Sequence, residues 1–376
     1  MSAKTSNLEP RTSNSSSSTS NVERRTGRPA GRPYAFSNSF SSTSNLEPRT
    51  SNLPLKALVT GGAGFIGSNI VKRLLEQGIH PVVLDDLSSG YKENLLPEVK
   101  FIKGDVRDRE TVEKAMAGCN VVFHLAASVG NKRSIDDPLT DSGINVLGTL
   151  NVLEAVRKHS IQRIVFSSSA GIFGELKTLP IAEDHPQDPD SPYGTSKLAA
   201  EKMCLVYNKL YGMRNVCLRY FNVYGLNQRY DAYGNVIPIF ANRILKDESL
   251  TIYGDGEQTR DFVNVADVAA ANIAAAFSPD ACGVFNIGSG TRVTINELAR
   301  MIQEAAGTEV GKEFAPPRPG DVRDSLADIN AAQKAFGFAP QTDLKEGLAE
   351  YMDWIKHDPV SSSMFEVRGS TLKKKT

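Results

Sequence analysis

Short apolar runs alternate with stretches of helical spacing along residues 53–221. The runs rich in β-branched and aliphatic residues predict strands at Leu55–Thr60, Val82–Leu84, Val99–Lys103, Val121–Leu125 and Arg163–Phe166. Between them, the recurrence of apolar positions predicts helices over Phe65–Gly78, Asp108–Met116 and Leu139–Lys158. Strands that alternate with helices form a parallel sheet covered on both faces. The expected fold class is therefore α/β, a doubly wound parallel Rossmann sheet.

The two ends of the chain differ from this pattern. Residues 1–52 contain 14 Ser and almost no aliphatic residues, which predicts a disordered tail. The decapeptide TSNLEPRTSN occurs there twice, at Thr5–Asn14 and Thr43–Asn52, and a transit peptide remains an alternative for this Ser- and Arg-rich stretch. Beyond Asn222, prolines and glycines interrupt the pattern, which indicates a smaller C-terminal substrate-binding region. The expected segments are a tail over 1–52, a Rossmann domain over 53–221 with a contribution from 259–289, a substrate-binding region over 222–258 and 290–357, and a second tail over 358–376.

The charge and the cysteine content of the chain indicate which partners, metal sites and cellular locations are not expected. The 43 Lys and Arg balance the 43 Asp and Glu, so the net charge is zero, and neither nucleic acid nor an anionic membrane is expected as a partner. No apolar run is long enough to span a bilayer. The four cysteines are scattered, so neither a disulfide framework nor a metal site is expected, and a reducing, cytoplasmic location fits best.

A glycine-rich loop carries the first chemical signal. Gly61, Gly64 and Gly67 lie between a predicted strand and a predicted helix, where glycine permits a tight turn and a close approach to a pyrophosphate. The helix N-terminus adds free N–H groups and a positive dipole end. Asp85 ends the next strand, where a carboxylate accepts both adenosine ribose hydroxyls and repels a 2′-phosphate. These features predict NAD rather than NADP as the cofactor.

A serine, a tyrosine and a lysine carry the second signal. Tyr193 and Lys197 stand four residues apart, which places them on one face of a helix. A nearby ammonium is expected to lower the pKa of the tyrosine, which can then exchange a proton with a sugar hydroxyl. Ser169 ends the triplet Ser167–Ser169 after a predicted strand, at the edge of a parallel sheet where ligands bind. We expect Ser169 to hydrogen-bond the reacting oxygen.

At this point the chain resembles a known family. The motifs TGGAGFIGS, LDDLSSG, GDVRD, HLAAS, SSSA, YGTSK, RYFNVYG, YGDGEQTRDF and RPGDVRDSLAD occur in this order. Over about residues 55–356, the chain is similar to the extended short-chain dehydrogenase/reductases, in particular their NAD-dependent nucleotide-sugar epimerases. The resemblance implies a homodimer, in which helices near Leu139–Lys158 and Pro192–Tyr211 pair across a twofold axis.

The resemblance also implies a set of binding residues. Those expected at NAD are Gly61, Gly64, Phe65, Ile66, Gly67, Asp85, Asp86, Leu87, Ser88, Ser89, Gly90, Asp105, Val106, Leu125, Ala126, Ala127, Val129, Asn145, Ser167, Tyr193, Lys197 and Phe221. Those expected at a UDP-sugar substrate are Arg133, Ser169, Asn222, Tyr253, Arg260, Arg318, Asp321 and Ser325. The two arginines Arg260 and Arg318 would clamp the diphosphate, because guanidinium meets phosphate oxygens in bidentate geometry.

Two residues after the serine select among the reactions of the family. The 4,6-dehydratases carry Asp and Glu there and the uronate decarboxylases carry a Glu, whereas this chain has Ala170 and Gly171. The resemblance then implies 4-epimerization, for which Ser169, Tyr193, Lys197 and a tightly held NAD suffice. A UDP-uronate 4-epimerase or decarboxylase is the alternative enzyme, and a non-catalytic NAD-binding scaffold is the alternative of another class. Ser325 borders the sugar's carbon-2 substituent in the family, so its small side chain leaves room for an N-acetyl group.

Overall fold

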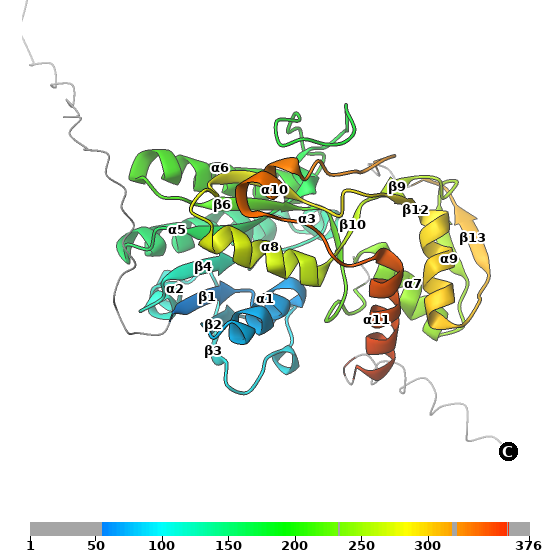
Figure 1. Cartoon of the computed structure of the whole chain (residues 1–376), viewed down its shortest axis with the longest axis horizontal. Coiled ribbons are helices and arrows are strands. Elements are labelled where there is room, and N and C mark those ends of the chain that lie inside the picture. The colour runs from blue at the N-terminus through cyan, green and yellow to red at the C-terminus, as the bar shows by residue number, and fades with distance from the viewer. Residues whose placement is uncertain (1–54, 232–233, 318–321, 359, 361–376) are drawn as a thin grey trace, which may run out of the picture. The chain divides into compact units, whose positions relative to one another are not determined.

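The computed structural model describes residues 55–231, 234–317, 322–358 and 360. A seven-stranded, all-parallel sheet occupies the centre of this part of the chain (Figure 1). Predictions that concern residues 1–52, most of 358–376, Arg318 and Asp321 lie outside the described residues.

The strand order of the sheet is β11-β6-β5-β4-β1-β2-β3. The strands are β1 (Lys56–Thr60), β2 (His80–Asp85), β3 (Lys100–Lys103), β4 (Val121–His124), β5 (Ile164–Ser169), β6 (Val216–Tyr220) and β11 (Gly283–Ile287). The order reverses direction between β1 and β4, which is the topological switch point where doubly wound sheets bind ligands. The predicted Rossmann-type fold is confirmed, and the five predicted strands correspond to β1–β5.

Helices cover both faces of the sheet because successive strand residues point to opposite sides. Val59 packs on one face with α1 (Phe65–Glu76) and α8 (Val265–Phe277). Its neighbour Leu58 packs on the other face with α2 (Arg109–Met116), α5 (Thr149–Lys158) and α6 (Pro192–Tyr211). Strands buried on both faces read as continuous apolar runs, which is the pattern seen in the sequence.

The helix expected over Leu139–Lys158 differs from the prediction. It consists of α4 (Pro138–Ser142), a π-helical segment η2 (Gly143–Gly148) and α5. The segment places Asn145 inward, where its side chain bonds both backbone groups of Ser128, at 2.9 Å to the N–H and 3.0 Å to the carbonyl oxygen. A π-helical turn of this kind often marks a functional site.

A third hydrophobic core lies beyond the sheet, among α7 (Val236–Leu245), α9 (Ile295–Ala306) and α11 (Leu344–His357). Three two-stranded ladders, β10–β7, β12–β9 and β13–β8, surround this region. Their strands are β7 (Asn222–Tyr224), β8 (Leu250–Tyr253), β9 (Thr259–Arg260), β10 (Phe262–Asn264), β12 (Val293–Thr294) and β13 (Lys312–Ala315). The remaining short helices are α3 (Asn131–Asp136), α10 (Asn330–Phe336) and the 3₁₀ turns η1 (Lys92–Asn94) and η3 (Ala170–Ile172).

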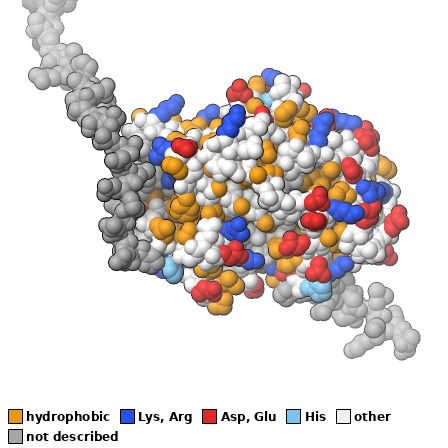
Figure 2. Space-filling view, in the orientation of Figure 1, with side chains coloured by type: hydrophobic (Ala, Val, Ile, Leu, Met, Phe, Trp, Pro, Cys, Tyr) orange, Lys and Arg blue, Asp and Glu red, His pale blue; other side chains and the backbone are white. Residues whose placement is uncertain are grey.

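The surface mixes charges of both signs. On the face drawn in Figure 2, basic and acidic side chains are interspersed with apolar ones. Within the described ranges, no helix has the length and apolar character needed to cross a bilayer.

Candidate active site

The glycine loop joins β1 to α1 in a conformation that side chains would obstruct. Gly61 has a φ of +69°, in the left-handed region that favours glycine. A Cβ on Gly67 would lie only 2.1 Å from the carbonyl oxygen of Gly61, so helix and loop pack backbone to backbone. Gly64 is the N-cap and offers no side chain over the first N–H groups of α1. This bare helix N-terminus fits the pyrophosphate of a dinucleotide.

Asp85 stands at the carboxyl end of β2, where its side chain is 7% exposed. Its two oxygens accept N–H groups from Ala63, at 2.9 Å, and from Leu87, at 2.8 Å. Burial raises the pKa of this carboxyl, and the two N–H groups act in the opposite direction. Each oxygen keeps a lone pair for a ribose hydroxyl. Asp86, Ser88 and the rest of the loop to Gly90 follow at the surface or partly buried.

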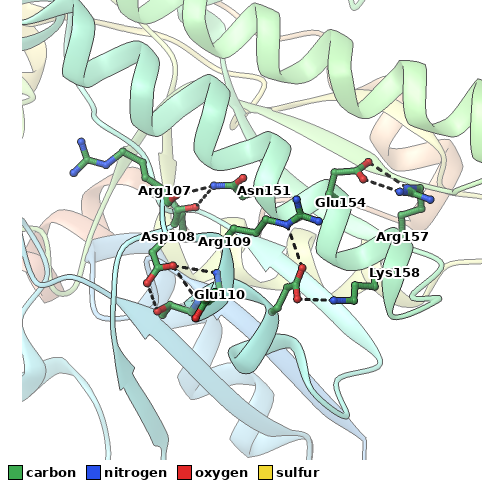
Figure 3. A network of polar contacts seen from close by, with 11 residues as sticks. Arg107, Asp108, Arg109, Glu110, Asn151, Glu154, Arg157 and Lys158 are labelled. Atoms are coloured by element: carbon green, nitrogen blue, oxygen red, sulfur yellow. Dashed lines mark hydrogen bonds and ion pairs between the residues drawn. The ribbon is translucent and has the colours of Figure 1, made fainter.

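The adenine side of the expected groove is held by α5. Asn151 donates to the carbonyl oxygen of Val106 at 3.0 Å and to that of Arg107 at 2.9 Å (Figure 3). Arg107 also pairs with Asp105, whose pKa it holds below the ordinary value. Lys158 of α5 also forms an ion pair with Glu113 of α2 at 2.6 Å, and Figure 3 shows the pair of Arg157 with Glu154 within α5. Hydrogen bonds from α5 therefore hold the loop after β3 in place.

The expected cofactor residues gather at one edge of the sheet, because the carboxyl ends of parallel strands meet there. Leu125, Ala126, Ala127 and Val129 follow β4, and Ser167 lies within β5. Phe221 lies between β6 and β7 and is 6% exposed. None of these placements tests the individual contacts, which remain predictions.

Ser169, Tyr193 and Lys197 come together where β5 ends and α6 begins. The side chains of Ser169 and Tyr193 both lie beside Gly171, and the Ser169 Oγ accepts the N–H of Gly171 at 3.1 Å. Lys197 lies one turn further along α6 and is 3% exposed. Its Nζ is 4.5 Å from the centroid of the Phe166 ring. The predicted spacing on one helix face is confirmed by this geometry.

The expected lowering of the tyrosine pKa is wrong for the chain by itself. Burial raises the pKa of Tyr193, the Ser169 side chain lowers it, and the charge of Asp141 raises it. Burial also lowers the pKa of Lys197 to about 8, so part of its positive charge is lost near neutral pH. The sequence argument considered the charge of Lys197 but not the cost of burying both groups.

Gly171 lies beside Ser169 and Tyr193. A Cβ at this residue would lie 3.3 Å from the Oγ of Ser169 and 3.7 Å from the ring of Tyr193. Any side chain at 171 would therefore start next to the Ser169 hydroxyl and the Tyr193 ring.

The substrate residues lie on the short ladders and loops. Asn222 donates to the carbonyl oxygen of Asp261 at 3.1 Å, and Arg260 donates to that of Thr259 at 2.8 Å. Ser325 is 6% exposed, two residues before Ala327, which packs with Phe221 and Ala170.

Two further residues expected at the substrate are Tyr253 and Arg133. Tyr253 ends β8 and is partly buried. Arg133 forms an ion pair with Asp231 at 2.7 Å, so its predicted contact with substrate requires this pair to open or to be shared.

The chain matches known proteins over most of its length. Residues 57–288 match the model of the NAD dependent epimerase/dehydratase family. A putative UDP-glucose 4-epimerase of Methanocaldococcus jannaschii is 43% identical over 303 residues, which are 80% of this chain and 98% of the relative. The chain belongs to the NAD dependent epimerase/dehydratase family.

Two solved structures of similar proteins have the same fold as this chain. A UDP-glucose 4-epimerase of Thermotoga maritima with UDP-glucose is 38% identical, with a TM-score of 0.78 over 80% of this chain and 99% of that one. A UDP-N-acetylglucosamine 4-epimerase of Methanobrevibacter ruminantium in complex with UDP-N-acetylmuramic acid is also 38% identical, with a TM-score of 0.77 over 81% of this chain and 98% of that one. The predicted family and its NAD cofactor are confirmed.

Sequence reasoning missed a buried network in this epimerase/dehydratase family member. Asp141 is fully buried and accepts the hydroxyl of Ser196 at 2.6 Å and the amide of Asn145 at 3.1 Å. Ser196 also receives an N–H from Asn145 at 2.9 Å, and it lies next to Lys197 on α6. The four-residue spacing of Asp141 and Asn145 was a usable signal, because it places both on one helix face.

Proposed function

We propose that the protein interconverts a UDP-hexose and its 4-epimer through a transient 4-keto sugar. The observation that carries the proposal is that Ser169 and Tyr193 lie together beside a glycine at 171. Dehydration or decarboxylation needs an added acid or base at this position, whereas oxidation and reduction at carbon 4 need only one proton acceptor and donor. The named activities of the Methanocaldococcus and Thermotoga relatives support UDP-glucose as one substrate.

Each of the three proposed active-site residues has its own role in the proton transfer. Tyr193 accepts the proton of the carbon-4 hydroxyl and later returns it to the 4-keto oxygen. Ser169 donates a hydrogen bond to the same oxygen. Lys197 holds the cofactor's ribose and lends its charge to the Tyr193 oxygen.

The residues at the sheet edge fit NAD. The bare N-terminus of α1 suits the pyrophosphate, and the Asp85 carboxylate suits a ribose that carries no phosphate. When bound, NAD supplies the hydride acceptor and donor and a positive charge that favours the phenolate of Tyr193. In the chain without NAD the pKa of Tyr193 is raised, so its hydroxyl is a poor base. The positive charge of bound NAD would lower this pKa.

We further propose that the sugar pocket has room for a carbon-2 substituent. Ser325 is a small residue at the position implied by the resemblance to border that carbon, and the Methanobrevibacter relative is named for UDP-N-acetylglucosamine. We therefore include UDP-N-acetylhexosamines among the substrates.

Product analysis in D₂O tests the reaction. Purified protein incubated with UDP-glucose or UDP-N-acetylglucosamine is expected to give the 4-epimer, with the carbon-4 hydrogen retained because hydride never exchanges with solvent. Deuterium at carbon 4 or loss of water would each contradict the proposal. UDP-glucuronate in the same assay tests the alternative uronate activity, and Tyr193→Phe serves as the inactive control.

We also propose a homodimer formed through the outer faces of α4, α5 and α6. Large apolar side chains are exposed there, with Leu139 at 86%, Leu210 at 67% and Leu147 at 60%. Exposed apolar patches of this kind mark protein–protein contacts. Mixed ion pairs such as Glu154–Arg157 lie beside them and suit a polar rim.

Light scattering tests the assembly. Leu210→Asp is expected to give a monomer at micromolar concentration, because a charge would enter a helix–helix contact. Phe314→Asp is the matched control, since Phe314 is 61% exposed on β13, away from these helices. A monomeric wild type would contradict the proposed dimer.

A cytoplasmic location is part of the proposal. All four cysteines lie in the described part of the chain and are free, three of them buried. Free thiols in a folded chain suit a reducing compartment. Localisation of a fluorescent fusion checks this, and export of the protein would contradict it.

A further inference from the structure

Arg229 lies outside the expected cofactor and substrate sites, yet its side chain contacts two separate parts of the molecule. It belongs to the loop between β7 and α7 and is 6% exposed. Its Nε and Nη2 donate to the two carboxylate oxygens of Asp358, at 2.8 Å and 2.6 Å. Asp358 follows the last residue of α11 and is 4% exposed at its side chain. A bidentate, buried guanidinium–carboxylate pair is a strong and directional contact.

The third nitrogen of the same guanidinium points to the other half of the molecule. Its Nη1 donates to the Oδ1 of Asn94 at 2.7 Å, and its Cζ lies 4.4 Å from the centroid of the Tyr91 ring. Tyr91 and Asn94 end the loop that follows Asp85. The ring of Trp354, on α11, lies 5.6 Å away. Arg229 therefore ties the C-terminal end of α11 to the loop after β2.

A continuous chain of hydrogen bonds leads from there to the ribose carboxylate. The Asn94 Nδ2 donates to the carbonyl oxygen of Ala63 at 2.8 Å, and the Tyr91 N–H donates to the same oxygen at 3.0 Å. The N–H of Ala63 in turn donates to Asp85 Oδ2 at 2.9 Å. Ala63 is in the glycine loop and is fully buried. The backbone of one residue, Ala63, thus connects the loop that Arg229 holds to the carboxylate expected at the ribose.

The loop that carries Arg229 is itself fixed on both sides. Asn69 of α1 donates to the carbonyl oxygen of Leu226 at 3.0 Å, and Asn227 donates to Ser68 at 3.0 Å. Tyr351 of α11 donates to the carbonyl oxygen of Gln228 at 2.7 Å. Arg229 is thus presented from a rigid support, which is required for a side chain that positions others.

We propose that Arg229 is a positioning residue for the cofactor, which couples Asp358 at the end of α11 to the loop that binds the adenosine ribose. This inference rests on the proposed role of Asp85. Without Arg229, Tyr91 and Asn94 lose their anchor, the Ala63 backbone is free to turn, and Asp85 is no longer held in its orientation. The C-terminal helix of the substrate region thereby contributes to NAD affinity without touching NAD.

Binding measurements on five variants test the coupling. NAD-stripped protein is titrated with NAD and, separately, with UDP in a calorimeter, and thermal unfolding is recorded without ligands. Arg229→Met is expected to weaken NAD binding roughly threefold to thirtyfold, the usual range for contacts that act through neighbours. UDP affinity is expected to stay within about twofold of wild type, a split that general loss of stability would not produce.

The second and third variants keep the proposal falsifiable if Arg229→Met folds poorly. Arg229→Met combined with Asp358→Leu leaves no buried charge unpaired and is expected to restore thermal stability but not NAD affinity. Asn94→Ala cuts the other end of the link and is expected to weaken NAD binding by a similar factor. Arg300→Met is the control, because it removes an exposed pair with Glu304 on α9 and is expected to change neither affinity.

Two results have different consequences. If Asp85→Ala abolishes NAD binding but the paired variant and Asn94→Ala both bind NAD as wild type does, the coupling is overturned and the cofactor site stands. If Asp85→Ala itself binds NAD normally, the ribose assignment fails and the coupling fails with it.

Discussion

The two halves of the molecule are stabilised in different ways. The cofactor half is one parallel sheet of seven strands between helices, so its site residues are placed by backbone ladders. The substrate half consists of two-stranded ladders around a separate core, and side chains hold its segments together. Asp261 is the clearest case, since it is fully buried and accepts N–H groups from Ser289 at 2.6 Å, Ala327 at 3.0 Å and Gly290 at 3.2 Å. Loss of one side chain should therefore harm the substrate half more than the cofactor half.

The largest effect is expected for proton transfer by Tyr193, which lies where the cofactor half and the substrate half meet. Tyr193→Phe is expected to lower kcat roughly 10²–10⁴-fold, because general acid–base catalysis contributes this much. NAD content and UDP affinity should remain those of wild type, since the ring and helix are preserved. Stopped-flow or product assays with NAD quantified after denaturation check this. Turnover at the wild-type rate would remove Tyr193 from the mechanism.

The next largest effect is expected at Asp261. Asp261→Ala leaves several buried N–H groups without acceptors and should lower the free energy of unfolding by roughly 2–5 kcal/mol. UDP-sugar affinity should fall more than NAD affinity, because the released segments lead directly into Arg260 and Ser325, which are expected at the substrate. Chemical denaturation and calorimetry measure both. Equal losses for the two ligands would mean that the halves do not differ as described.

Replacing Lys197 is expected to have a smaller effect on the free energy of unfolding, and one of opposite sign. Burial lowers the pKa of Lys197 from 10.5 to about 8, so the folded chain binds its proton less tightly than the unfolded chain does. Below pH 8 the buried charge costs stability, and Lys197→Met should raise the free energy of unfolding of NAD-free protein by about 1–3 kcal/mol.

The pH dependence gives the sign of this effect. Wild-type stability should rise between about pH 8 and pH 10.5, as the unfolded chain alone remains protonated, and the gain in Lys197→Met should shrink over the same range. Denaturant titrations at pH 7 and pH 10 check it. A destabilised variant at pH 7 would show that the contact with the Phe166 ring outweighs the cost of burial.

The smallest expected effect is a change of specificity. Ser325→Tyr should reduce kcat/KM for UDP-N-acetylglucosamine relative to UDP-glucose by about tenfold, since one pocket contact is worth about 1–3 kcal/mol. Stability should change little if the ring reaches the sugar pocket. Parallel kinetics on both substrates measure the ratio. An unchanged ratio would mean that Ser325 does not border carbon 2.

The comparison also explains which features could be predicted from sequence. The glycine loop, Asp85 and the Tyr193–Lys197 spacing follow from local patterns next to regular strands and helices, and all were predicted. The Arg229–Asp358 pair joins residues 129 positions apart, and a local pattern contains no signal for it. The direction of the Tyr193 pKa depends on burial by distant segments, which spacing does not reveal. The π-helical segment at Asn145 was missed because its apolar spacing resembles that of an ordinary helix.

The glycine at position 171 also bears on how such enzymes diverge. Its φ is not in the left-handed region, so the backbone accepts any ordinary residue, and two of the four glycine codons become glutamate codons by one base change. The obstacle is local, because the new Cβ would have to share space with the Ser169 Oγ at 3.3 Å. A lineage that eased this contact by a small shift would acquire a carboxyl group beside the reacting sugar. In evolutionary terms, the protein stands one mutation and one minor repacking step from a site equipped for different chemistry.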